Sequence, residues 1–293
     1  METKKLRYLM AFLPDKLYLE ICYLIKTHKR LNLKEPQTFN EKMQWLKLYN
    51  RQMQYTKMVD KYKVRDLIRE KIGEEYLIPL VGGPYMNVNE IDFDALPRQF
   101  VLKCNHDSGS VIVCKDKEKL DYEAVRKKLD NCLKHNFWYL GREWPYKNVS
   151  PCIIAEKYMV DESGEELKDY KFFCCNGEPE IIQVDFGRFK EHKRNFYDKD
   201  WQYIDVTIGV PTDPQTVICK PKQLENMLRI ARTLSKGFPF LRIDFYSIEG
   251  RVYFGEFTFF HGSGFEKFEP EIYERYLGSK IPIGTYIRRD NGH

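Results

Sequence analysis

The sequence LRIDFYSIEGRVYFGEFTFFHGSG, residues 241–264, predicts two apolar strands joined by a tight turn. Three charged residues interrupt the apolar pattern, and these are Arg242, Asp244 and Glu256. A buried charge without a partner is costly, so such residues are usually exposed, paired or bound to a ligand. The hairpin is therefore the first candidate for a functional site.

The turn of this hairpin is expected around Gly250. A three-residue loop with a left-handed glycine places Arg242 opposite Glu256. Strand alternation then puts Arg242, Asp244, Glu256 and Thr258 on one face, where the two carboxylates are diagonal neighbours that can share one Mg²⁺ ion. A two-residue loop would put the carboxylates on opposite faces. An ordinary Arg242–Glu256 ion pair, with Asp244 in solvent, is the simpler alternative.

The composition narrows the class of protein. A chain of 293 residues, 43% hydrophobic and 15% aromatic, suits one large domain or two closely associated ones and argues against long disordered regions. The net charge of +5, from 48 basic and 43 acidic residues, is too balanced to indicate nucleic-acid binding and suits an anionic ligand. The eight cysteines lack C-x-x-C or zinc-type spacing, so we expect buried free thiols in a reducing cytoplasm.

The first 30 residues, METKKLRYLMAFLPDKLYLEICYLIKTHKR, are both basic and apolar. They lack a small-residue cleavage site, and Pro14 and several charges interrupt the apolar run, so neither a signal peptide nor a membrane span is indicated. We expect an amphipathic helix packed on the protein. The alternative is a peripheral contact with the inner face of the membrane.

The remaining pattern alternates helices with hairpins. Thr38 and Glu41 have the spacing of a capping box at the start of a helix. Asn176-Gly177 is a strong signal for a two-residue hairpin turn between two apolar runs. Helices interleaved with mostly antiparallel hairpins predict an α+β fold.

Three stretches, in this order, resemble the ATP-grasp superfamily: FVLKCNHDSGSVIV, IIAEKYMV and RIDFY…GEFTFFHGSG. More closely, the chain resembles the TupA-like ATP-grasp family of bacterial polysaccharide gene clusters. This likeness covers nearly the whole chain, including EPQTFNEKMQWLKLY, LPRQFVLKCNHDSGS and DYKFFCCNGEPEIIQVD. It implies an ATP-grasp fold, with two α+β subdomains that sandwich the nucleotide, after an N-terminal helical region at 1–75. The implied small lobe with a phosphate-binding turn spans 76–155, and the C-terminal lobe with the metal site spans 156–293.

The resemblance implies a set of nucleotide-binding residues. A lysine on the first of the three stretches and the small-residue turn after it would bind the ATP phosphates. The end of the second stretch would contact adenine through side chains and main chain, and an acidic residue that follows this stretch would bind ribose. These residues are Lys103, Ser108, Gly109, Ser110, Glu156, Lys157, Tyr158, Met159 and Asp161, with Glu162 as an alternative ribose ligand.

The resemblance also implies that Asp244 and Glu256 hold Mg²⁺. Many ATP-grasp enzymes have Asn two residues after the second metal ligand, whereas this chain has Thr258, which leaves the number of metal ions open. Candidates to neutralise charge in the transition state are Arg242, Arg188 and Lys171, in addition to the phosphate-binding lysine. His106 and His261 are candidate general bases.

The implied activity is an ATP- and Mg²⁺-dependent ligation of a carboxylate with an amine through an acyl phosphate. The family setting suggests a uronic acid or another sugar carboxylate of a capsular or cell-surface polysaccharide, in a cytoplasmic enzyme that contacts membrane or glycan-assembly proteins at most peripherally. An ATP-grasp kinase, a silent nucleotide-binding module and a glycosyltransferase using a nucleotide sugar are the alternatives. A D-x-D motif at a strand end would favour the last, but DFD at 92–94 and DKD at 198–200 are expected in a loop and a turn.

Overall fold

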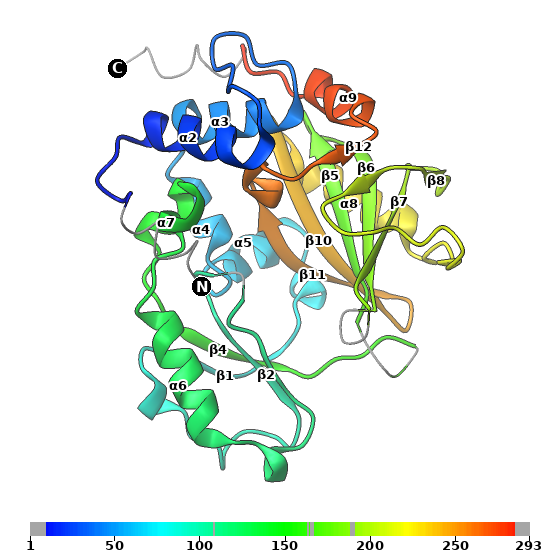
Figure 1. Ribbon diagram of the computed structural model, residues 1–293. Coiled ribbons are helices and arrows are strands. Elements are labelled where there is room, and N and C mark those ends of the chain that lie inside the picture. Colours follow the sequence, from blue (N-terminus) through cyan, green and yellow to red (C-terminus); the bar gives the residue numbers. More distant parts are fainter. Residues whose placement is uncertain (1–9, 108, 163, 165–166, 188–190, 285–293) are drawn as a thin grey trace. The chain divides into compact units, whose positions relative to one another are not determined.

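The computed structural model describes residues 10–107, 109–162, 164, 167–187 and 191–284. The described chain forms two units, one from Met1–Arg51 with Val160–His293 and the other from Gln52–Met159. Each unit has its own sheet, so the mixed α+β character predicted from the sequence is confirmed (Figure 1).

The larger unit is built on an antiparallel six-stranded sheet with the order β11-β10-β5-β6-β7-β8. Its strands are β5 (Asp169–Cys175), β6 (Glu178–Phe186), β7 (Lys193–Tyr197), β8 (Tyr203–Ile204), β10 (Phe240–Ile248) and β11 (Arg251–Thr258), and the short β9 (Thr207–Ile208) and β12 (Phe268–Glu269) pair separately. The turn between β5 and β6 is the predicted one, because Asn176 and Gly177 both have positive φ and Cys175 pairs with Glu178.

The two faces of this sheet differ in chemistry because side chains alternate along each strand. Phe172, Ile243 and Phe245 are fully buried on the apolar face. Helix α8 (Leu224–Ser235) packs against β5, β6 and β10, and Cys174 of the apolar face hydrogen-bonds with Ser235 of this helix. The charged residues at alternate positions, such as Asp244, therefore lie on the opposite face.

Helices from both ends of the larger unit lie side by side near the sheet (Figure 1). They are α2 (Asp15–Thr27), α3 (Phe39–Tyr49) and α9 (Ile272–Lys280), with the short η5 (His261–Gly264) next to α3. The Thr38–Glu41 capping box is confirmed at the start of α3. Phe39 then packs on Phe173 and Phe240, with ring centroids 6.4 and 5.0 Å apart, on the same sheet face as the charged residues.

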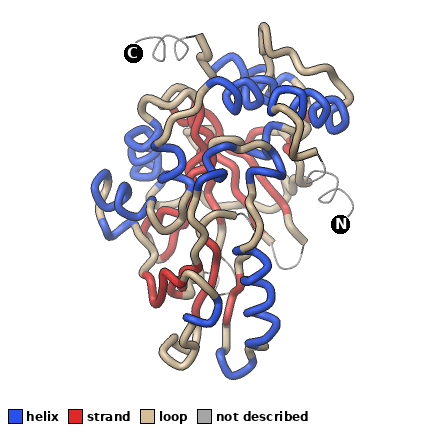
Figure 2. The backbone as a smooth tube through the Cα atoms, turned by 90° about the vertical axis from the view of Figure 1, so that its left-hand side faces the viewer, coloured by secondary structure: helices blue, strands red, loops and turns tan. Residues whose placement is uncertain are grey.

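The smaller unit contains an antiparallel four-stranded sheet with the order β1-β4-β2-β3. Its strands are β1 (Leu80–Tyr85), β2 (Phe100–Cys104), β3 (Ile112–Cys114) and β4 (Ile153–Lys157); its helices are α4 (Gln54–Val59), α5 (Val64–Lys71), α6 (Tyr122–Leu133) and α7 (Trp138–Gly141), with the 3-10 turns η1 (Glu74–Tyr76), η2 (Val88–Glu90), η3 (Lys117–Lys119) and η4 (Trp144–Asn148). Helix α6 runs alongside this sheet (Figure 2) and buries Val125 and Leu129 in an apolar cluster with Phe100 and Leu102 of β2.

The two units differ from the three regions expected from the sequence. Helices α4 and α5 lie within Gln52–Met159, because they pack with η4 and η1 of that unit. The N-terminal helical region therefore divides after Arg51. None of the helices in the described part of the chain has the length and apolar content needed to cross a membrane.

A glycine permits the close approach of α9 to the start of α3. A Cβ on Gly278 would lie 2.3 Å from the Gln37 carbonyl oxygen and 2.9 Å from the Phe39 nitrogen. Because these are backbone atoms, Gly278→Ala should lower the free energy of unfolding on the order of 1–2 kcal/mol, in spite of the better helix propensity of alanine. Urea denaturation measures this change.

The matched control is Gly284→Ala, where nothing lies within 4 Å of the new Cβ. We expect this control to stay within about 0.5 kcal/mol of the native protein. Equal stability of the two variants would contradict the close packing of α9 on α3.

Candidate active site

The charged face of the larger sheet brings together four of the predicted site residues. Asp244 of β10 pairs directly with Lys171 of β5 on one side and with Glu256 of β11 on the other. Arg242 lies two residues before Asp244 and so on the same face. The expectation that Arg242, Asp244, Glu256 and Thr258 share one face is therefore met in this sheet, and Lys171 lies on the same face.

The register of the hairpin differs from the predicted one. Its loop has two residues, Glu249 and Gly250, which both have positive φ as a type I′ turn requires. An irregularity between Asp244 and Phe245 then adds one residue, Gly255, to β11. The predicted three-residue loop was wrong. The bulge adds a second one-residue shift of register, which returns Glu256 to the face of Asp244, so the two residues pair directly instead of diagonally.

Gly255 suits this bulge because the backbone of the partner strand is close. A Cβ at this position would lie 3.1 Å from the Asp244 carbonyl oxygen and 3.4 Å from the Asp244 Cβ. The added residue also makes Thr258, rather than Glu256, the direct partner of Arg242. The bulge thus brings the second carboxylate level with the first.

Asp244 is the most enclosed carboxylate in this row, with 1% of its side chain exposed. Arg242 binds it with two hydrogen bonds, Nε to Oδ1 at 2.7 Å and Nη2 to Oδ2 at 2.8 Å, and Lys171 Nζ lies 2.5 Å from Oδ2. Burial by itself raises the pKa of Asp244, but the charges of Arg242 and then Lys171 outweigh it and lower the pKa. Asp244 is therefore a permanent anion at neutral pH.

Glu256 is more accessible, with 32% of its side chain exposed. Arg242 Nη2 lies 3.2 Å from Glu256 Oε1, so one guanidinium joins both carboxylates. Each carboxylate offers more lone pairs than these contacts use. Oxygen ligands of this kind, one buried and one open, fit Mg²⁺, which keeps several water or phosphate oxygens in its shell.

Further charges extend the row across β5, β6 and β7. Lys171 Nζ lies 3.6 Å from Asp169 Oδ1 and 3.8 Å from Asp185 Oδ2. Asp185 in turn accepts from Arg194 Nε at 2.8 Å and from Gln183 Nε2 at 3.1 Å. Asp169 and Lys171 lie two residues apart on one face of β5, and both are buried.

Among the described residues, this cluster holds more carboxylates than cations. Its cations are Lys171, Arg194 and Arg242, and its carboxylates are Asp169, Asp185, Asp244, Glu256 and Glu266. Within the described ranges, no three His, Cys, Asp or Glu side chains are already grouped closely enough to form a complete metal site.

A chain of contacts links Arg242 to Glu266 through a buried histidine. Arg242 Nη1 donates to His261 Nδ1 at 2.9 Å, and His261 Nε2 lies 2.9 Å from Glu266 Oε2. Burial, together with Arg242, lowers the pKa of His261 although Glu266 opposes this effect. The neutral ring with its proton on Nε2 satisfies both neighbours, and neither nitrogen offers a free lone pair to a substrate amine.

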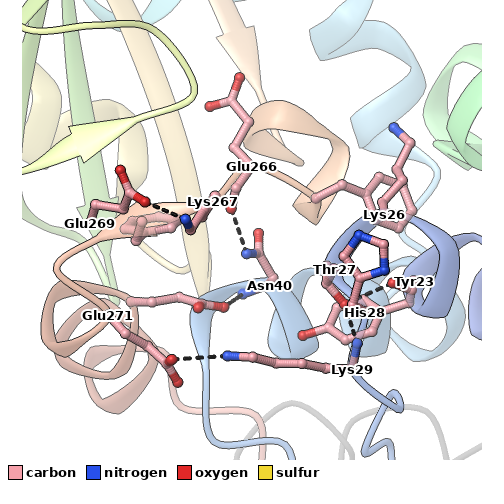
Figure 3. A pocket seen from close by; sticks show the side chains of 13 residues that line it. Tyr23, Lys26, Thr27, His28, Lys29, Asn40, Glu266, Lys267, Glu269 and Glu271 are labelled. Carbon is pink, nitrogen blue, oxygen red and sulfur yellow. Dashed lines mark hydrogen bonds and ion pairs between the residues drawn. The ribbon is translucent and has the colours of Figure 1, made fainter.

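Glu266 points its carboxylate away from the pocket that its backbone lines (Figure 3). Asn40 Nδ2 of α3 donates to the Glu266 carbonyl oxygen at 2.8 Å and fixes this backbone. Burial raises the pKa of Glu266, but His261 and then Arg194 and Arg242 outweigh it and lower the pKa to about 2. Glu266 is therefore a fixed negative charge and not a general base at neutral pH.

The HGSG turn, residues 261–264, is held by hydrogen bonds from α3. Gly262, Ser263 and Gly264 have φ values of 55, 55 and 66°. Gln44 Nε2 donates to the Ser263 and Gly264 carbonyl oxygens at 3.0 and 2.7 Å, and Lys47 Nζ donates to the Ser263 carbonyl at 2.8 Å. Gln44 and Lys47 belong to α3 and are fully buried, so this helix holds the turn in place through buried side chains.

Sequence reasoning missed these supporting residues of α3. Asn40, Gln44 and Lys47 are spaced i, i+4 and i+7, which puts them on one face of the helix. They lie beside buried apolar residues such as Met43 and Leu46. A polar stripe on the buried side of a helix requires hydrogen-bond partners elsewhere in the protein, and this signal was available in the sequence.

The smaller unit contains the predicted phosphate-binding residues. Lys103 Nζ of β2 lies 2.6 Å from Glu156 Oε2 of β4, and Arg65 Nη1 of α5 lies 3.9 Å from Glu156 Oε1. Burial lowers the pKa of Arg65, and Glu156 opposes this shift. Glu156 therefore holds two cations, of which sequence reasoning had identified only Lys103.

Side-chain hydrogen bonds stabilise the small-residue turn that follows β2. Ser110 Oγ donates to Asp107 Oδ1 at 2.5 Å and accepts from the Cys104 N–H at 2.8 Å, so this hydroxyl has a structural partner on each side. Gly109 is exposed, and a Cβ added there would have nothing within 4 Å. Lys61 Nζ donates to the Asp107 carbonyl oxygen and is a further cation that sequence reasoning missed. Ser108 lies outside the described residues.

The remaining predicted residues are more dispersed. Lys157 is exposed, and its N–H donates to the Pro79 carbonyl at 2.9 Å. Tyr158 and Met159 are partly exposed at the end of the smaller unit. Asp161 belongs to the larger unit, pairs with Lys168 at 2.7 Å and lines a cavity of about 520 Å³. Arg188 lies outside the described residues.

His106 is buried, with 2% exposure. Its Nε2 lies 3.2 and 3.1 Å from the carbonyl oxygens of Cys132 and His135, and its Nδ1 lies 3.3 Å from Asn105 Oδ1. Asn105 also donates to Asp60 Oδ1 at 2.9 Å. These contacts indicate that His106 organises the loop rather than acting on a substrate.

The sequence model of the TupA-like ATPgrasp family matches residues 41–282. The chain belongs to this family. Family membership confirms the predicted ATP-grasp fold. No curated protein sequence matches it.

Solved structures that resemble this TupA-like protein include D-alanine–D-alanine ligase from Helicobacter pylori, with 14% identity and a TM-score of 0.44 over 83% of this chain and 69% of that chain. The Bacillus anthracis D-alanine–D-alanine ligase complexed with ATP has 14% identity and a TM-score of 0.38, over 69% of this chain and 53% of that chain. A RimK domain ATP-grasp protein from Sphaerobacter thermophilus has 8% identity and a TM-score of 0.42, over 80% of this chain and 70% of that chain.

The buried charge of Glu266 predicts a pH dependence of stability. Because its pKa falls from an ordinary value of 4.5 to about 2, its stabilising effect is complete above pH 4.5 and is lost as the pH falls toward 2. Glu266→Gln should therefore lower the free energy of unfolding by up to about 3 kcal/mol at pH 7, and the difference from the native protein should shrink between pH 4.5 and 3. Guanidinium denaturation at pH 7, 4 and 3 measures this.

The matched control is Glu269→Gln, three residues along the same segment, where the side chain is 57% exposed. This variant should follow the native protein at every pH. A constant difference between Glu266→Gln and the native protein over the whole pH range would show that the carboxylate does not gain its stability from the charge cluster.

Proposed function

We propose that this ATP-grasp ligase joins a carboxylate to an amine through an acyl phosphate, with ATP and Mg²⁺, and that the carboxylate belongs to a uronic acid or sugar precursor of a capsular or other cell-surface polysaccharide. The observation that carries the ATP- and metal-dependent part is the buried row in which Asp244 and Glu256 face each other beside Arg242 and Lys171. The proposal includes peripheral contact with a membrane or with glycan-assembly enzymes.

The chemistry requires several anions to meet. The substrate carboxylate attacks the γ-phosphorus of ATP and ADP leaves, and the amine then attacks the acyl carbon and releases phosphate, so that an amide forms. Repulsion among these anions is the main barrier, and fixed cations lower it most in a site that excludes water. Lys171 and Arg242 are held in place by Asp244 and need no reorganisation to act.

In this proposal Mg²⁺ would be held by Asp244 and Glu256 and would neutralise phosphate charge. The nucleotide would be bound by Lys103, Gly109, Ser110 and Glu156, together with Ser108, Lys157, Tyr158 and Met159, and its ribose by Asp161. Lys61 and Arg65 join this set because one contacts the Asp107 carbonyl and the other faces Glu156. Arg188 would meet the acyl phosphate.

Glycosyl transfer from a nucleotide sugar finds little support. The D-x-D stretch at Asp92 to Asp94 lies between η2 and β2, outside any strand, and the one at Asp198 to Asp200 lies in a turn. Both placements agree with the sequence-based expectation. The second stretch directly follows β7, but this strand pairs antiparallel with both of its neighbours and the stretch forms a turn of the sheet.

The first test concerns the metal ligands. Asp244→Asn and Glu256→Gln keep the size of each side chain but remove its charge, so we expect Mg²⁺-dependent ADP release to fall at least 100-fold in each variant. Steady-state ADP release with a panel of acids and amines measures this. Lys103→Ala, in contrast, should chiefly raise the KM for ATP.

The matched control is Glu249→Gln at the tip of the same hairpin, where the side chain is exposed. Its activity should equal that of the native protein. Full activity of Asp244→Asn and Glu256→Gln would overturn the assignment of the metal site.

The second test separates ligation from its alternatives. A ligase with an acyl phosphate needs both a uronic acid and an amine for rapid ADP release, and hydroxylamine in place of the amine should give a hydroxamate. An ATP-grasp kinase would release ADP with the sugar alone and give no hydroxamate. UDP release from a UDP-sugar without ATP would instead establish the glycosyltransferase.

A further inference from the structure

His192, the residue immediately before β7, lies beside the charged row of the larger sheet. Its Nε2 is 3.4 Å from Asp185 Oδ1, the same oxygen that accepts from Arg194 Nε and Gln183 Nε2. The Asp185 side chain is 2% exposed, whereas the His192 side chain is 37% exposed. The pair therefore consists of a buried carboxylate and an accessible imidazole.

Asp185 decides which nitrogen of His192 is free. A carboxylate can only accept hydrogen bonds, so the proton of a neutral imidazole is placed on Nε2, which is buried next to Asp185. At 3.4 Å this contact is longer than an ordinary hydrogen bond, and contacts of a catalytic base are often this long before a substrate is bound. Nδ1 has no hydrogen-bond partner among the residues that the structure describes, so its lone pair is available to accept a proton.

Two contacts connect this imidazole with the proposed metal site. Lys171 Nζ lies 3.8 Å from Asp185 Oδ2 and 2.5 Å from Asp244 Oδ2. His192 therefore belongs to the cluster of charges in which the acyl phosphate is proposed to form. Because its ring is accessible, it can meet a second substrate that arrives from solvent.

The two histidines selected from the sequence lack this combination. Both nitrogens of His261 are engaged, one by Arg242 and the other by Glu266. Both nitrogens of His106 lie within 3.3 Å of oxygen atoms of the protein. His192 differs from both because its ring is accessible and one of its nitrogens is held by a buried carboxylate.

We propose that His192, oriented by Asp185, is the general base for the substrate amine. The proposal rests on the ligase function proposed above. Nδ1 takes one proton from the ammonium group, and the freed lone pair forms the C–N bond to the acyl carbon. The bond between this carbon and the phosphate oxygen breaks, and phosphate leaves with the electron pair and the second N–H proton, so that the amide is neutral. Asp185 then stabilises the imidazolium, as the carboxylate does in other carboxylate–histidine pairs.

The test compares two nucleophiles on the purified full chain with ATP, Mg²⁺ and either D-glucuronate or D-galacturonate. Ethanolamine is an ammonium ion at neutral pH and must lose a proton before it attacks, whereas hydroxylamine is already uncharged. We expect His192→Gln, which keeps an N–H donor, to lower amide formation with ethanolamine by about 100-fold or more, the usual contribution of a general base. Hydroxamate formation, and the ADP release that accompanies it, should remain near the native rate.

A second variant tests the proton transfer directly. In His192→Ala, added imidazole should restore part of the lost amide formation, because the free base can occupy the vacated space, whereas a purely structural loss would not respond. The matched control is Glu191→Gln, the preceding residue, whose side chain is 80% exposed. Both reactions of this control should run at the native rate.

Equal amide formation by His192→Gln and the native chain would overturn the role of His192 and leave the ligase function intact. An equal loss with both nucleophiles would overturn it as well, since the defect would then lie in the formation of the acyl phosphate. If the native chain formed no hydroxamate with either acid, the proposed ligation of a uronic acid would be wrong, and the role of His192 with it.

Discussion

The arrangement of charged residues in the larger unit depends on the buried carboxylate of Asp244, which lies between Arg242 and Lys171. Removing these charges from water costs several kcal/mol for each ion, and only close contacts with good geometry offset that cost. The sheet supplies this geometry, because pairing of β10 with β5 sets Lys171 directly beside Asp244, and alternation along β10 sets Arg242 on the same face. Once these three residues are in place, the position of Glu256 and the chain through His261 to Glu266 follow from the same guanidinium.

The turn at residues 261–264 shows how distant segments support this arrangement. A non-glycine residue such as Ser263 adopts a left-handed conformation only where its surroundings compensate. The buried amide of Gln44 and ammonium of Lys47 supply that compensation by binding the carbonyl groups of the turn. Helix α3 therefore has a structural role in the site, although none of its residues was identified as a site residue from the sequence.

The hairpin of β10 and β11 illustrates how far local patterns reach. The Asn176-Gly177 turn could be predicted because its geometry depends on two adjacent residues. The loop at Glu249 and Gly250 could not, because the number of residues between paired positions also depends on the bulge at Gly255. The loop is one residue shorter than predicted, and β11 contains one extra residue. Together these two changes keep Asp244 and Glu256 on the same face, so the prediction of a shared face holds although the predicted register was wrong.

The sequence by itself determined the family and the α+β class, because both depend on the order of motifs along the chain. It also determined the capping box at Thr38 and the charged residues within apolar strands, because these depend on local spacing. Only the tertiary structure decided which charges meet. Glu156 binds Lys103 and Arg65, Lys61 reaches Asp107, and Asp185 binds Arg194, and in each case the partners come from different elements. Such pairs form where strand register and helix packing bring buried charges together, and no local pattern in the chain encodes that proximity.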